Sequence, residues 1–115
     1  MGWATSLAPK VVDKAESPLV AKEVETSFRS SDPAVARQFA EVTFYSDHRR
    51  ELNDLDIPVL IIQCSEDSIV PIEVGQYLHR HLKHSTLQIL EVKGHYPHLS
   101  HPEETAQLIY HFLLN

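Results

Sequence analysis

The run IPVLIIQC at positions 57–64 limits more than any other feature what this chain can fold into. It is continuously apolar, rich in β-branched residues and as long as one strand. Such runs are typical of parallel strands that helices cover on both faces. The segments that follow have the patterns of a helix (IEVGQYLHRHL), a second strand (STLQILEV) and a closing helix (PEETAQLIYHFLLN). We therefore predict an α/β fold ordered strand, helix, strand, helix, which is half of a doubly wound parallel sheet.

The first half of the chain has a helical pattern and contains no good strand. Ser17 with Pro18, and Asp32 with Pro33, have the order of an N-cap and a first helical residue. The apolar piece WATSLAPKVV is expected to be interrupted by Pro9. We predict a helical region at 1–50 and an α/β region at 51–115. Because two parallel strands rarely form a stable sheet, we expect further strands to be missing from this chain.

Composition excludes several functional classes. The net charge is −6 at pH 7, which argues against a nucleic-acid surface, and no apolar run is long enough to cross a membrane. The single cysteine, Cys64, excludes an internal disulfide and fits a reducing, cytoplasmic setting. Since Cys64 ends an apolar strand pattern, we expect a buried hydrophobic residue, not a nucleophile.

Two loops follow the predicted strands. The first begins at Glu66 and Asp67, and the second contains His95 directly after Gly94. Because parallel strands end at one edge of a sheet, we expect Asp67 and His95 to meet there, with Glu66 as the rival acid. A carboxylate that orients a histidine is the acid–base part of a catalytic triad.

His95, His98 and His101 also suggest metal ligands, but we predict no metal and no cofactor. Two prolines argue against a helix through this segment, and no further ligand has convincing spacing. Loop hydrogen bonds, and capping of the last helix by Ser100 or His101, are the expected roles of this segment.

The segments PVLIIQCSEDSIVP and GHYPHLSHPEE resemble the C-terminal half of an α/β-hydrolase. With the upstream segment DPAVARQFAEVTFYSDHRREL, they are similar more narrowly to RsbQ-like stress-signalling hydrolases and to plant strigolactone and karrikin receptors. The resemblance implies that Asp67 is the triad acid and His95 the triad base. It also implies that residues 1–50 belong to a lid above a substrate pocket, and that 51–115 is a segment of the core.

Apolar side chains in the region assigned to the lid are candidates for the pocket wall. We expect substrate contacts from Phe28, Phe39, Val42, Phe44 and Val70. The alternative is that such helix-spaced residues only hold the lid helices together.

The sequence departs from the family at the nucleophile. Its three glycines, Gly2, Gly75 and Gly94, form no G-x-S-x-G elbow, and the oxyanion loop and central strands are absent. We therefore expect the chain alone to be inactive, whether it is a fragment, a truncated product or half of a split protein. The function implied for the intact protein is serine hydrolysis of small esters. The alternative is a signalling module of the RsbQ type that acts through a regulatory partner. We also expect homo-oligomers, or docking to a missing N-terminal half, through an exposed strand edge.

Overall fold

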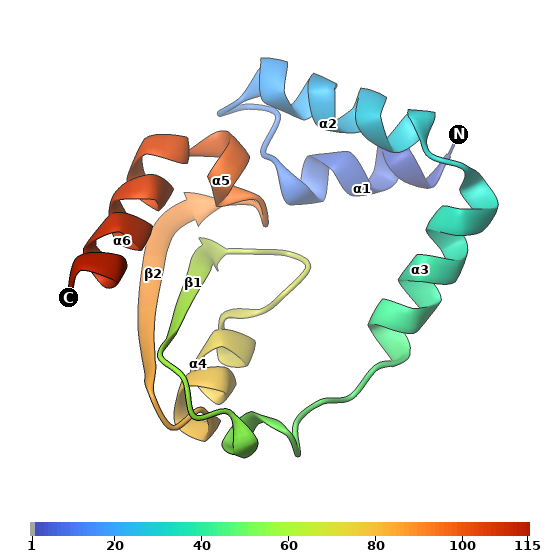
Figure 1. Ribbon diagram of the computed structural model, residues 1–115. Helices are drawn as coiled ribbons and strands as arrows, with labels where there is room; N and C mark the ends of the chain where they lie inside the picture. The colour runs from blue at the N-terminus through green and yellow to red at the C-terminus, as the bar shows by residue number, and fades with distance from the viewer. Residues whose placement is uncertain (1) are drawn as a thin grey trace.

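The computed structural model describes residues 2–115 and has an α/β architecture (Figure 1). Three helices come first, and two strands alternating with helices follow. The elements are α1 (Trp3–Val11), α2 (Pro18–Ser30), α3 (Pro33–Tyr45), the short 3₁₀ helix η1 (Leu52–Asp54), β1 (Val59–Glu66), α4 (Ile72–His81), β2 (Ser85–Lys93), α5 (Pro97–Ser100) and α6 (Pro102–Leu114). The predicted order of strand, helix, strand and helix is confirmed, with α5 as an addition.

Proline and its preceding residue set several helix starts. Asp32 caps α3, since its carboxylate accepts hydrogen bonds from the amides of Ala34 (2.8 Å) and Val35 (3.2 Å). Ser17 occupies the N-cap position of α2, but its side chain makes no capping bond.

Helix α1 continues through Pro9, so the predicted interruption is wrong. Proline removes one hydrogen bond, but burial of Ala4, Ala8 and Val11 on one side of α1 stabilises the helix by packing.

Strands β1 and β2 pair in parallel, as the apolar run predicts. The register joins Val59 to Ser85 and continues to Cys64 and Leu90, and it shifts between Cys64 and Glu66. Within residues 2–115 the sheet has these two strands, so each has one unpaired edge. Helix α4 contacts both strands and α6 contacts β1.

The main apolar core lies outside the sheet. It joins helices α1 and α2 through five buried residues, which are Ala8, Val11, Val12, Ala21 and Val24. Ile69 and Tyr96, from the loops after β1 and β2, pack against this cluster. Figure 1 shows α1 and α2 side by side near the carboxyl ends of both strands. The helical hairpin α1–α2 is therefore built onto the two loops in which we predicted the site.

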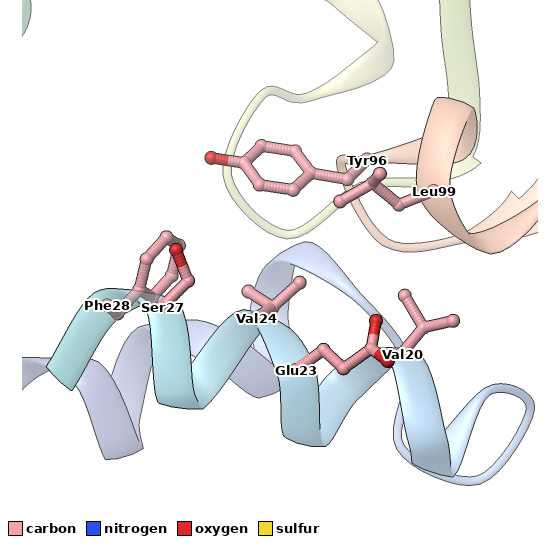
Figure 2. Close-up of a pocket in the computed structure, with 7 residues that line it drawn as sticks. All are labelled: Val20, Glu23, Val24, Ser27, Phe28, Tyr96 and Leu99. Atoms are coloured by element: carbon pink, nitrogen blue, oxygen red, sulfur yellow. The ribbon is translucent and has the colours of Figure 1, made fainter. Parts of the chain in front are cut away.

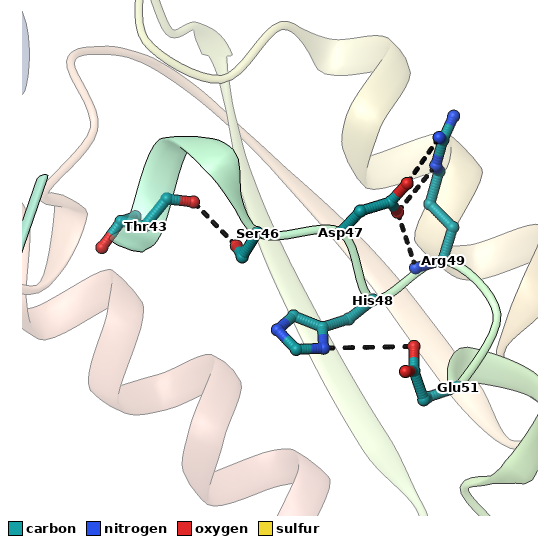
Figure 3. Close-up of polar contacts among 6 residues, drawn as sticks. All are labelled: Thr43, Ser46, Asp47, His48, Arg49 and Glu51. Carbon is teal, nitrogen blue, oxygen red and sulfur yellow. Dashed lines mark hydrogen bonds and ion pairs between the residues drawn. The ribbon is translucent and has the colours of Figure 1, made fainter. Parts of the chain in front are cut away.

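Helix α3 leaves this core and has no buried residue. Three apolar residues spaced along it, Val35, Phe39 and Val42, are between 63% and 74% exposed. A polar turn then leads back to η1 (Figure 3). There Asp47 pairs with Arg49 at 2.6 Å, and this hydrogen bond lowers the pKa of Asp47 to about 2.

The segment 93–102, predicted as a loop, contains the four-residue helix α5. Its first residue is a proline, and the amide hydrogens of Leu99 and Ser100 both bond the Tyr96 carbonyl. A single turn is too short to show a helical pattern in sequence. No helix in residues 2–115 combines the length and apolar character that crossing a membrane requires.

Candidate active site

Asp67 and His95 meet at the carboxyl edge of the sheet. The distance from His95 Nδ1 to Asp67 Oδ2 is 2.6 Å. The side chain of Asp67 is only 4% exposed, whereas that of His95 is 34% exposed. Because an ionised carboxylate only accepts hydrogen bonds, this contact assigns the proton to Nδ1 of a neutral His95. The other nitrogen, Nε2, then has a lone pair free to accept a proton.

The loop after β1 fixes the second oxygen of Asp67. Oδ1 accepts hydrogen bonds from the backbone amides of Ile69 (2.8 Å) and Val70 (2.9 Å). An aspartate at the start of a turn commonly bonds backbone amides two and three residues later. The two carboxylate oxygens therefore have different partners, one in the loop and one on His95.

Gln63 connects this loop to the strand, a role that was not predicted from the sequence. Its Nε2 donates to the carbonyls of Val70 (3.0 Å) and Cys64 (3.1 Å) while the residue is buried in β1. Gly75 of α4 makes room for it, since a Cβ there would lie 2.7 Å from Gln63 Oε1. In the sequence, the sign of this role is one amide side chain inside an apolar run.

The loop after β2 holds His95 through its backbone. Gly94 has a φ of 107°, which favours glycine. The amides of His95 (2.8 Å) and Tyr96 (2.9 Å) both donate to the carbonyl of Val11. This contact between the end of α1 and the histidine loop was not predicted from the sequence.

Comparisons with known proteins show which proteins this chain is similar to. No family model matches it. It is 38% identical over 85 residues to the pimeloyl-[acyl-carrier protein] methyl ester esterase of Neisseria meningitidis serogroup C, covering 74% of this chain and 33% of the esterase. It is 32% identical over 108 residues to the strigolactone esterase D14 of Arabidopsis thaliana, covering 93% of this chain and 40% of that protein.

Solved structures show a similarity of the same kind as the sequence relatives. A hydrolase from Oleispira antarctica superposes with a TM-score of 0.89 at 38% identity, covering 99% of this chain and 42% of that chain. The chain belongs to the α/β-hydrolase superfamily. The enol-lactonase from Burkholderia xenovorans LB400, at 18% identity and a TM-score of 0.89, shares the fold. This α/β-hydrolase chain spans about a third of the first curated relatives' length.

Cys64 of this α/β-hydrolase chain is 2% exposed, and burial, followed by the charge of Asp67, raises its thiol pKa to about 11. A thiol with such a pKa stays protonated near neutral pH, which does not suit a nucleophile.

The other two histidines of the cluster, His98 and His101, make contacts of a structural kind. His101 Nδ1 lies 2.8 Å from Ser100 Oγ, and the His98 ring lies 5.3 Å from that of Tyr96. His101 occupies the N-cap position of α6 without a side-chain capping bond, so the predicted capping is wrong. Within residues 2–115 no three His, Cys, Asp or Glu side chains gather as metal ligands.

A groove of about 330 Å³ lies beside the histidine loop (Figure 2). Its walls are Val20, Glu23, Val24, Ser27 and Phe28 of α2, with Tyr96 and Leu99 opposite them. Of the five predicted substrate contacts, Phe28 lines this groove.

The other four predicted contacts lie elsewhere. Phe39, Val42 and Phe44 are on α3 and at least 68% exposed. Val70 supplies backbone groups to the Asp67 loop. The structure therefore brings Asp67 and His95 together but does not gather the predicted pocket residues.

Proposed function

We propose that this chain supplies the acid and base of an α/β-hydrolase triad, with Asp67 as the orienting acid and His95 as the base. The observation that carries the proposal is the 2.6 Å contact between His95 Nδ1 and Asp67 Oδ2, with the ring one third exposed. A triad needs this arrangement, in which a buried carboxylate fixes the tautomer and leaves Nε2 for the nucleophile.

The proposed reaction is ester hydrolysis through a serine on another segment. His95 Nε2 takes the serine proton as the hydroxyl attacks the ester carbonyl, and the imidazolium formed is stabilised by Asp67. The imidazolium then protonates the leaving alcohol. Water repeats the sequence on the acyl-enzyme with His95 again as the base.

We propose small esters as substrates, because the curated relatives are named esterases. The groove offers Val20, Val24 and Phe28 as apolar contacts for part of such a substrate. On this proposal residues 1–50 form part of a lid and 51–115 part of the core. A receptor role through a regulatory partner, homo-oligomers and a cytoplasmic location stay predictions.

The test needs a nucleophile as well as this chain. A chimera would join this chain to the part of the Oleispira antarctica hydrolase outside the matched region, and p-nitrophenyl acetate hydrolysis would be measured. We expect His95→Ala and Asp67→Asn each to lower kcat by roughly 10³- to 10⁴-fold, the effect of losing a triad member. His98→Ala is the matched control, and its activity should be unchanged.

Two results would contradict the proposal. One is a chimera whose activity survives His95→Ala. The other is burst hydrolysis by the 115-residue chain alone that disappears in its His95→Ala variant, since the sequence contains no G-x-S-x-G serine.

A further inference from the structure

The carbonyl of Val11, the last residue of α1, forms its hydrogen bonds outside its own helix. The last carbonyls of a helix have no partner inside it. This one accepts two hydrogen bonds from outside the helix, from the amides of His95 (2.8 Å) and Tyr96 (2.9 Å). Val11 and its neighbour Val12 are 2% and 0% exposed, so water does not compete for these groups.

Gly94 makes this approach possible. Val12 and Gly94 form an isolated antiparallel bridge. A Cβ at Gly94 would lie 2.7 Å from the Val11 carbonyl oxygen, and the φ of 107° would also strain any L side chain. Both space and backbone conformation therefore require glycine directly before His95.

The hairpin α1–α2 that presents this carbonyl also contacts the acid's loop. Ile69 packs on the same core cluster as Tyr96, and the Ile69 amide bonds Asp67. One buried hairpin is thus packed against both loops that bring the acid and base together.

We propose that the Val11 carbonyl, with Val12 and Gly94, forms a backbone clamp that orients His95 toward Asp67. The clamp residues are positioning residues, since none touches a reacting atom. The inference rests on the proposed function for the role of His95 as a base. It adds that the helical hairpin, in addition to the sheet, sets the direction of the imidazole.

The test uses the ¹⁵N-labelled 115-residue chain and two NMR readouts. Hydrogen exchange reports the amides of His95 and Tyr96, and the ring ¹⁵N shifts of His95 report which nitrogen carries the proton. In Gly94→Ala we expect both amides to exchange at least about five-fold faster, the effect of losing one hydrogen bond. We also expect the Nδ1–H tautomer to give way to a mixture. Gly2→Ala is the control, because a Cβ there meets nothing within 4 Å.

Should Gly94→Ala lose its far-UV circular dichroism, a second variant decides. A semi-synthetic chain with an ester in place of the peptide bond before His95 removes only that N–H donor and leaves Gly94 in place. We expect the same tautomer mixture. A pure Nδ1–H tautomer in the folded variant would overturn the clamp. Neither readout uses hydrolysis, so failure of the clamp and failure of the proposed triad are separate results.

Discussion

Two sets of hydrogen bonds hold the Asp67 carboxylate in one orientation. Oδ1 accepts hydrogen bonds from two backbone amides, and Oδ2 accepts one from His95. Both oxygens therefore have the partners that a buried charge requires. Glu66, the rival acid, ends β1 and is exposed. Asp67 follows the last residue of β1, and its carboxylate reaches both the turn amides and His95.

Cys64 allows a direct test of burial beside the site. With its thiol pKa raised from 9.0 to about 11, the thiolate fraction at pH 8 falls by about 100-fold. We expect an aromatic disulfide reagent to label the native chain at least about 100-fold more slowly than the chain in concentrated urea. Cys64→Ala provides the background. Equal rates in the two conditions would show that Cys64 is exposed.

The raised pKa of Cys64 also predicts how the stability of the fold depends on pH. Because folding raises the pKa of this acid, its contribution to stability is complete below pH 9 and is lost as pH rises from 9 to about 11. Cys64→Ala should lack this alkaline loss in urea unfolding curves.

At the scale of elements, one glycine sets how closely α4 approaches β1. The contact of Gly75 with Gln63 lets the buried amide reach the Val70 carbonyl and so fixes the Asp67 loop. Glycine lowers helix propensity by up to about 1 kcal/mol relative to alanine. Close packing against Gln63, and not helix propensity, therefore explains why position 75 is a glycine.

A double-mutant cycle tests that packing. Gly75→Ala should lower the free energy of unfolding by about 1 kcal/mol, because a clash of about 1–3 kcal/mol exceeds the gain in propensity. In a Gln63→Ala background the same change should instead raise it by roughly 0.5–1 kcal/mol. Urea unfolding measures all four proteins. The same sign in both backgrounds would refute the contact.

Patterns in the sequence predicted both strands and most helices because each has enough residues to show a period or a start signal. They also predicted that Asp67 and His95 meet, since parallel strands end at one edge. The roles of the Val11 carbonyl and the Gln63 amide could not be predicted from the sequence, because each depends on distances between segments far apart in the chain. The exposure of α3 was equally hidden, since an apolar face in sequence does not say what covers it.

At the scale of the molecule, apolar surface is left open. Helix α3 exposes Val35, Phe39, Val42, Phe44 and Tyr45. In the part of the chain that the structure describes, β1 and β2 each have one edge without a partner strand. Exposed apolar patches and unpaired edges favour association. In the α/β-hydrolase structures that match, this chain corresponds to less than half of the protein.

We therefore expect the isolated chain to self-associate as its concentration rises. Size-exclusion chromatography over a dilution series should show elution moving toward the monomer position. The double variant Phe39→Lys and Val42→Lys should stay monomeric at concentrations at which Gln38→Lys, the charge control on the same helix, still associates. Unchanged association in the double variant would assign it to the strand edges or another surface.

The pairing of Asp67 with His95 has a consequence for how a gene of this kind can be divided. The two residues are 28 positions apart, and β1, α4 and β2 bring them together within one short stretch. A reading frame interrupted anywhere before position 59 leaves both residues on the same translation product. Two products from such a divided gene would therefore need a single association to bring the Asp67–His95 pair, which we propose as acid and base, to a nucleophile on the other product.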